Sequence, residues 1–275
     1  MNVRAEVSAS GALDGRGATP LYFACREGHT GVVTKLLAVN ANVELADNEG
    51  FTPLFVACGV GRTEVVAKLL AANADVEQPS DEGATPMAIA CQEGHLGCVQ
   101  LLSSYGANRN FPFPAPEDTA EGVANAHGRH DIVAWLVRTR LWSTPLHHLE
   151  FLTPERALAL LHAGADIHAA AEPGGPTPLS LAQDLAAAGR AAEGTAAFLV
   201  LEAAKPWSRQ THKYFPDPAR ARAVELWPWA FRFSRQPRFA GAEQAMFDVW
   251  MTIVMAHAVT RGYQPPRRSA RLAKP

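Results

Sequence analysis

The sequence predicts an all-α solenoid of about six repeats, with a helical module at the C-terminal end. Two sets of residues recur at a spacing of 33 positions, as in 52 − 19 and 85 − 52. They are the pairs Thr19-Pro20, Thr52-Pro53 and Thr85-Pro86, and the cysteines Cys25, Cys58 and Cys91. A fixed period of this length is typical of stacked units, each of which buries its apolar face only against its neighbours.

Each Thr-Pro pair predicts the start of a unit of two helices, as the first unit illustrates. Thr19 can cap a helix with its side chain, and Pro20 suits the first helical turn, where a backbone donor would be unpaired. Gly28 is expected to end that helix because it tolerates a positive φ. A second helix follows with one apolar stripe, made of Val32, Val33, Leu36 and Leu37. Asn40 then stands at the turn, since asparagine is next to glycine in tolerating a left-handed backbone.

The same string of residues returns twice at full period and then loosens. The proline-rich stretch 111–116 predicts a loop, because proline lacks a backbone donor and biases its neighbour away from the helix. Later helix starts are expected at Thr119, Thr144-Pro145 and Thr177-Pro178. The predicted units are residues 14–47, 48–80, 81–113, 114–140, 141–171 and 172–204, after a flexible segment at residues 1–13.

Residues 205–263 differ in composition from the repeats and predict a separate helical module. Four of the six tryptophans lie after Pro206. A helix is expected over residues 219–226, and Pro228 should end or kink it. A last helix, apolar over much of its circumference, is expected over about residues 242–260. The basic residues 264–275 are predicted to be a disordered tail.

The strings Thr52-Pro53-Leu54 and Thr144-Pro145-Leu146-His147, with the glycine that closes the first helix, resemble the ankyrin-repeat family. The resemblance is close over residues 14–110 and looser up to residue 204. It alone implies short β-hairpin fingers between the repeats, and a non-catalytic module that binds a protein partner through a concave surface of these fingers and the first helices.

Charge and hydropathy narrow the classes of function. A formal net charge of −2 argues against a nucleic-acid binder, which normally carries a basic surplus. No apolar run reaches the ~18 residues of a membrane span, and the N-terminal residues lack the basic-then-apolar order of a secretory signal. We therefore expect a monomeric protein of the cytoplasm or the nucleus, without nucleic-acid or membrane partners.

The cysteines and histidines are explained as repeat positions. Equivalent cysteines lie on helices about 8–10 Å apart, whereas disulfide-bonded Cα atoms are about 4.4–6.8 Å apart. Cys98 stands where the earlier repeats have valine, so we expect four buried thiols in a reducing compartment. The ten histidines lack the grouping of a structural zinc site, and the chain has neither a phosphate loop nor a nucleophile elbow. No catalytic residue, metal or cofactor is expected.

Partner contacts are expected at places whose side chains do not hold the repeat together. The family's binding surface maps onto two bands of this chain. The finger band is Arg16, Asn48, Glu49, Phe51, Asp81 and Glu82. The helix band, at the ends of the first helices, is Arg26, Glu27, Val60, Gln92, Glu93 and His127.

Phe51 is the foremost candidate among these residues. It stands where the neighbouring repeats have Ala18 and Ala84, and an exposed aromatic ring there would gain nothing obvious from the fold. Because aromatic anchors often dominate interfaces, we expect Phe51 and the acidic residues around it to be a hot spot for a basic or polar partner. Tyr22 and Phe55 are instead expected to pack between repeats.

Two functions stay open from the sequence. The favoured one is protein binding alone, with residues 205–263 as a cap over the open end of the stack. The alternative is a substrate-recruiting adaptor subunit of a ubiquitin-ligase-type or other enzyme complex, in which the C-terminal helices dock the scaffold.

Overall fold

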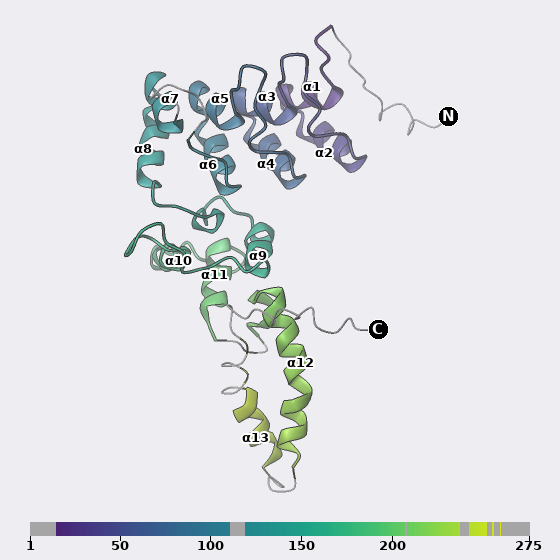
Figure 1. Ribbon diagram of the computed structural model, residues 1–275, viewed down its shortest axis with the longest axis vertical. Coiled ribbons are helices and arrows are strands. Elements are labelled where there is room, and N and C mark those ends of the chain that lie inside the picture. Colours follow the sequence, from purple (N-terminus) through teal and green to yellow (C-terminus); the bar gives the residue numbers. More distant parts are fainter. Residues whose placement is uncertain are drawn as a thin grey trace, which may run out of the picture. The chain divides into compact units, whose positions relative to one another are not determined.

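A computed structural model describes residues 15–110, 119–206, 208, 210–236, 242–251, 255 and 259 (Figure 1). The chain divides into two compact units, Met1–Phe151 with Ala171–Gly175, and Leu152–Ala170 with Pro176–Pro275. Each unit has buried apolar residues of its own. The predictions for residues 1–13, 111–116 and 264–275 lie outside the described residues, and the predicted domain boundaries stay predictions.

The first unit is a stack of helix pairs. Its helices are α1 (Pro20–Glu27), α2 (Thr30–Ala38), α3 (Pro53–Gly59), α4 (Thr63–Ala71), α5 (Pro86–Glu93), α6 (Leu96–Ser104), α7 (Ala120–Ala126) and α8 (His130–Arg138). The first helices α1, α3, α5 and α7 form one layer and the second helices form the other (Figure 1). The predicted all-α solenoid is confirmed. The described loops contain no strand, only one isolated bridge between Asn110 and Thr119, so the hairpin character of the fingers is not confirmed.

The local signals of the sequence produce the helix boundaries. The Thr19 side chain accepts a hydrogen bond from the Tyr22 backbone N–H at 3.1 Å, and Thr52 and Thr85 cap α3 and α5 in the same way. Gly28 closes α1 with a φ of 78°, and Asn40 has a φ of 59° at the end of the repeat. These conformations favour glycine and asparagine, which explains why these residues stand at the turns.

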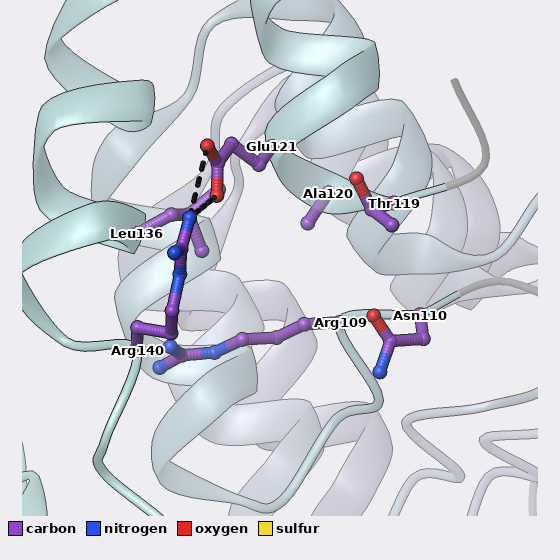
Figure 2. A pocket seen from close by; sticks show the side chains of 7 residues that line it. All are labelled: Arg109, Asn110, Thr119, Ala120, Glu121, Leu136 and Arg140. Atoms are coloured by element: carbon purple, nitrogen blue, oxygen red, sulfur yellow. Dashed lines mark hydrogen bonds and ion pairs between the residues drawn. The ribbon is translucent and has the colours of Figure 1, made fainter. Parts of the chain in front are cut away.

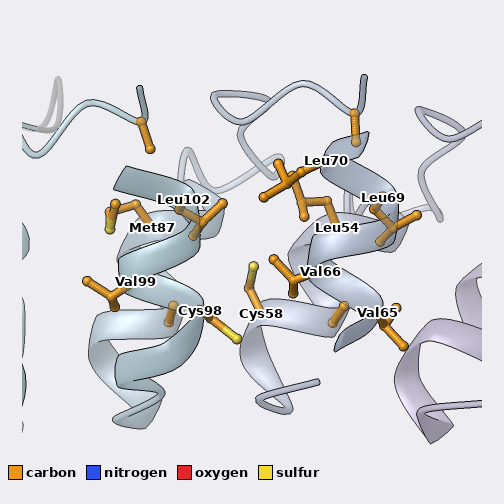
Figure 3. Packing of buried hydrophobic residues seen from close by; sticks show 14 of the residues in the cluster. Leu54, Cys58, Val65, Val66, Leu69, Leu70, Met87, Cys98, Val99 and Leu102 are labelled. Atoms are coloured by element: carbon orange, nitrogen blue, oxygen red, sulfur yellow. The ribbon is translucent and has the colours of Figure 1, made fainter. Parts of the chain in front are cut away.

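Buried side chains of neighbouring repeats form the core between the two layers. Leu54, Val66, Leu69 and Leu102 are among the fully buried residues (Figure 3). All four cysteines are buried and free, as predicted. Since each helix pair is short, most of its apolar surface is covered by the adjacent pair rather than by itself.

A row of hydrogen bonds fixes each repeat to the one before it. The side chain that precedes each second helix reaches the backbone carbonyl near the end of the previous first helix. The contacts are Arg62 Nε to the Arg26 oxygen (3.1 Å), His95 Nε2 to the Gly59 oxygen (3.1 Å) and Arg129 Nε to the Gln92 oxygen (2.9 Å). Because a carbonyl only accepts, the His95 proton lies on Nε2. Glycine makes room for this contact, since a Cβ on Gly28 would lie 2.9 Å from the Arg62 side chain.

The fifth predicted repeat departs from the pattern. Its Thr-Pro start leads only to a single 3₁₀ turn, Pro145–His147, in place of a first helix. A second start at Thr153-Pro154, which the sequence reading overlooked, begins the next helix, α9 (Pro154–His162). Thr153 caps α9 by accepting a bond from the Arg156 N–H at 3.2 Å. Thr153 follows Thr144 by nine positions, whereas ten positions separate Thr52 and Arg62, the N-cap residues of α3 and α4.

Aromatic side chains surround this shortened region of the first unit. The Trp135 ring lies edge-on to Trp142 at 6.4 Å and to Phe151 at 6.3 Å, and the His148 ring lies 5.0 Å from Trp142. Arg109 stacks over Trp135 at 5.0 Å. Burial, followed by the charges of Arg109 and His147, lowers the pKa of His148 to about 3.

The second unit contains the remaining helices. They are α9, α10 (Pro178–Ala187), α11 (Ala196–Ala204), α12 (Asp217–Ser234) and α13 (Glu243–Val249), with a 3₁₀ turn at His212–Tyr214. Helix α11 packs against both α9 and α10, and α12 packs against α13. The start of α12 belongs to a small core around Phe215, Ala219 and Ala223.

Helix α12 continues through Pro228 to Ser234, which corrects the prediction of a helix end at Pro228, whereas the predicted alternative of a kink there stays a prediction. Proline removes the donor for the carbonyl of Val224. Val224 and Pro228 are both exposed, so that carbonyl lies on the solvent side of the helix, whereas Ala223 and Ala230 are buried. Of the last predicted helix, α13, the π-helical residues 250–251 and the single residues 255 and 259 are described.

Replacement of Arg62 by alanine tests the bonds between repeats. We expect Arg62→Ala to lower the free energy of unfolding by ~1 kcal/mol, because the carbonyl of Arg26 loses a charged donor. Urea unfolding followed by circular dichroism measures the change. Arg62→His should recover part of the loss, as His95 does this task in the next repeat, and Arg138→Ala is the control with a change below ~0.5 kcal/mol. An equal loss in Arg62→Ala and Arg138→Ala would contradict the assignment.

The pKa of His148 predicts sensitivity to acid. The unfolded chain binds a proton on His148 near pH 6.5, whereas the folded chain binds it only near pH 3, so stability falls as the pH drops below 6.5. At pH 5 this group lowers the free energy of unfolding by ~2 kcal/mol relative to pH 7. Urea titrations at both pH values should show a smaller difference in His148→Phe than in the unchanged protein. The exposed His130→Gln is the matched control, and an undiminished pH difference in His148→Phe would sink the explanation.

Candidate functional site

The fingers between repeats are tight turns held by a side chain at their base. The Asp47 carboxylate accepts hydrogen bonds from the backbone N–H groups of Glu49 (3.0 Å) and Phe51 (2.9 Å). One repeat later, the Ser80 hydroxyl accepts from the Ala84 N–H at 3.2 Å. An acceptor at the same place in both fingers therefore fixes the backbone that carries the finger band.

Neighbouring fingers are joined through their tips. The Asn48 N–H donates to the Arg16 oxygen at 2.8 Å, and the Asp81 N–H donates to the Glu49 oxygen at 3.2 Å. The Asn48 side chain also donates to the Gly15 oxygen at 3.2 Å. Asn48 thus joins the first two fingers. This corrects the prediction from the sequence that none of the finger-band side chains holds the repeats together.

Phe51 also supports the fold. Its ring stacks on Phe55 of α3 with a centroid distance of 4.7 Å and an interplanar angle of 1°. Phe51 is half-buried, and Phe55 beneath it is buried. The expectation that an aromatic residue here gains nothing from the fold is therefore wrong, although one part of the ring stays accessible. The signal was present in the sequence, since residues 51 and 55 are four apart at a helix start.

Tyr22 and Phe55 pack inside the stack, as predicted. Tyr22 is 8% exposed and Phe55 is 7% exposed. Burial, and then the charge and hydrogen bond of Asp47, raise the pKa of Tyr22. This contact ties the second finger to α1, the first helix of the preceding repeat.

The accessible edge of the fingers is acidic. Glu49, Asp81 and Glu82 are exposed, and Arg16 takes the place of Glu49 and Glu82 in the first finger. The structure brings these four side chains onto consecutive finger tips, since the tips are bonded to one another. The three carboxylates outnumber the one guanidinium, so the edge attracts cationic groups.

The helix band lies at the other end of the first helices. Seven residues of helix separate the start from the end of α3, a rise of about 10 Å. Arg26 pairs with Glu27 at 2.9 Å, and the Gln92 amide donates to Glu93 at 3.1 Å. Val60 is 41% exposed. These side chains bond within their own repeat, so they are accessible to a partner without breaking contacts between repeats. His127 is also exposed and bonds the carbonyl of residue 123 at 3.0 Å.

An apolar row between the two bands was missed by the sequence reading. Phe23, Val56, Ile89 and Val123 occupy the same place in α1, α3, α5 and α7, and each is half-buried. Their spacing of 33, 33 and 34 residues was the signal that could have revealed them. The first-helix layer therefore presents an acidic edge, an apolar row and a mixed polar band, in that order along the helices.

A pocket of about 290 Å³ lies beside α7 and α8 (Figure 2). Arg140 reaches across it to Glu121 at 3.1 Å. Arg109 donates to the backbone oxygen and to the hydroxyl of Thr139, each at 3.0 Å, and its other terminal nitrogen has no hydrogen-bond partner among the described residues. Because most of the charge in this pocket is already paired, the finger and helix bands are the better candidate site.

In the part of the chain that the structure describes, no cluster of three or more histidine, cysteine, aspartate or glutamate residues has the arrangement of a metal site. Among the described helices, none combines the length and the apolar character needed to cross a bilayer.

A family model described as ankyrin repeats (3 copies) matches residues 3–80 and 68–144, which together span slightly more than half of the 275-residue chain. No curated protein gives a significant match. Proteins with such repeats are generally protein–protein interaction modules and are typically non-catalytic.

Replacement of Phe51 by alanine tests its part in the fold. We expect Phe51→Ala to lower the free energy of unfolding by ~1–2 kcal/mol, because it removes the stack on Phe55 and its buried area. Urea unfolding measures the change, and Val60→Ala in the helix band is the control, with a change below ~0.5 kcal/mol. If both variants were as stable as the unchanged protein, the stack would carry no folding energy.

Proposed function

Because the chain belongs to the ankyrin-repeat family, we propose that it acts by binding a protein partner along the first-helix layer of its first unit. The surface consists of the finger band, the apolar row and the helix band. The observation that carries the proposal is the acidic edge beside a row of half-buried apolar side chains. Singly scattered apolar residues are ordinary on a surface, but a row in fixed register is typical of an interface.

The charge of the fingers selects the partner. Glu49 and Glu82 occupy the same place in consecutive fingers, and Asp81 lies beside Glu82. A partner with lysine or arginine side chains at matching intervals gains charge complementarity, which raises the association rate and excludes acidic competitors. The partner segment is therefore basic along the side that faces the fingers.

The apolar row sets the length of the partner segment. Neighbouring packed helices lie about 8–10 Å apart, so a row over four first helices extends about 24–30 Å. A partner helix of about 16–20 residues covers that length. Phe51 contributes the accessible part of its ring at the second finger, where it stays our predicted hot spot.

Each band has a separate part in this proposal. The finger band, Arg16, Asn48, Glu49, Phe51, Asp81 and Glu82, provides charge and one aromatic contact. The helix band, Arg26, Glu27, Val60, Gln92, Glu93 and His127, provides a polar rim with one apolar residue. The adaptor role for residues 205–263 stays a prediction, because no feature of the described residues favours it over a cap.

Charge reversal on the fingers tests the proposal. In cells that produce the tagged chain, quantitative mass spectrometry of captured proteins should show partners that the double variant Glu49→Lys/Glu82→Lys retains about tenfold less, since two attractive charges become repulsive. Raising the salt concentration should weaken capture by the unchanged protein in the same direction.

The control for this experiment is Glu64→Lys. Glu64 is an exposed residue of the second-helix layer, so its reversal changes the net charge without changing the fingers. Circular dichroism confirms that all variants fold. Partners that both variants retain as well as the unchanged protein does would refute binding through the fingers.

A further inference from the structure

Two cysteines of adjacent repeats meet inside the first unit. Cys58 lies near the end of α3 and Cys98 near the start of α6, and both side chains are 0% exposed. Each thiol shifts the pKa of the other, raising that of Cys58 and lowering that of Cys98. Figure 3 shows both sulfur atoms in the space between the two repeats. The Thr63 hydroxyl lies 3.7 Å from the Cys98 sulfur.

The register of the stack explains this meeting. The place of Cys98 is held by Val32 in the first repeat and by Val65 in the second. Val32 is 48% exposed, whereas Val65 and Cys98 are 1% and 0% exposed, so this place faces the preceding repeat. By the same register, Cys25 faces a valine. The sequence reading compared only equivalent cysteines with one another and so overlooked a pair formed between different places.

We propose that Cys58 and Cys98 are an oxidisable pair that forms a disulfide bond between the second and third repeats. The oxidant is a hydroperoxide. The Cys98 thiolate attacks one peroxide oxygen, which yields a sulfenic acid and releases hydroxide, or water after protonation. The Cys58 thiol then attacks the Cys98 sulfur, the disulfide forms and the sulfenic oxygen leaves as a second water. Two thiols lose two electrons and two protons in total, and hydrogen peroxide becomes two molecules of water.

The surroundings assign the two roles. The Thr63 hydroxyl lies 3.7 Å from the Cys98 sulfur, where it can donate to a thiolate. The pKa shifts agree with this geometry, since the pKa of Cys98 is lowered and burial raises the pKa of Cys58. Because the thiolate is the nucleophile, Cys98 is the attacking residue and Cys58 the resolving one. The buried pair reacts after local opening of the stack, and a peroxide molecule needs little more space than water.

Bond formation brings together two sulfur atoms that both lie in the space between the second and third repeats (Figure 3), to a separation of about 2.05 Å. The bond would join residues 40 positions apart, 98 − 58, and a cross-link of this kind stabilises by restricting the unfolded chain. It would also fix α3 against α6, and with them the relative position of the fingers that carry Glu49 and Glu82.

The test treats the folded full-length chain with hydrogen peroxide. Trypsin leaves Cys91 and Cys98 on one peptide, because no lysine or arginine lies between Lys68 and Arg109. The experiment therefore uses Cys25→Ala/Cys91→Ala, which keeps the proposed pair. We expect a mass loss of two hydrogen atoms and a single cross-linked species that joins the Cys58 and Cys98 peptides. A thermal midpoint higher by about 5 °C or more should accompany it, and dithiothreitol should reverse both.

Cys98→Val, which installs the residue of the other repeats, is the matched variant. It should fold, lose the cross-link and show no rise of the thermal midpoint after peroxide. Two results would overturn the proposal. One is a folded Cys25→Ala/Cys91→Ala protein whose two thiols stay reduced or stop at sulfenic or sulfinic acid under peroxide. The other is a peroxide-dependent rise of the midpoint that persists in Cys98→Val.

Discussion

The stacking of each repeat on the one before it is the constraint on which the first unit depends. The same place of the second helix is exposed at Val32 and buried at Val65, because among the described residues only Val65 has a repeat in front of it. No helix pair supplies that cover itself, so the free energy of apolar burial comes from the neighbour. The hydrogen bond from Arg62 to the carbonyl of Arg26 fixes the orientation of one repeat on the next, because it is lost when a repeat slides or turns.

The proposed binding surface is a consequence of this register. Because the finger tips are bonded in series, Arg16, Glu49 and Glu82 are carried at a constant offset along one edge. The same offset aligns the apolar row on the first helices. A repeat that holds its neighbour through backbone groups leaves most tip side chains available for recognition. The chain can therefore change the sign of one finger, as Arg16 shows, without changing the stack.

The sequence predicts those features that depend on one residue and its near neighbours. Threonine caps, the closing glycines and Asn40 were readable because each has a local physical reason. The single turn at Pro145–His147 was not, since it follows from a competing helix start at Thr153. Residue type alone also did not predict the stacking of Phe51 on Phe55 or the hydrogen bonds of Asn48. Both depend on the exact spacing between the finger and the helix. The continuation of α12 through Pro228 depends on which side of the helix meets solvent, which a single sequence does not state.

The aromatic and the charged residues of the fingers differ in how much their substitution changes the stability of the fold. The Phe51 ring is shared between Phe55 and the proposed partner, so a substitution there affects folding and binding together. The exposed carboxylate of Glu82 accepts no hydrogen bond among those found for the described residues, so its charge changes recognition with little effect on the stack. Specificity carried by finger charges is thus separable from stability, whereas affinity carried by the aromatic ring is not. The charges along the finger edge can therefore change to suit a partner, while the buried core and the row of hydrogen bonds between repeats stay the same.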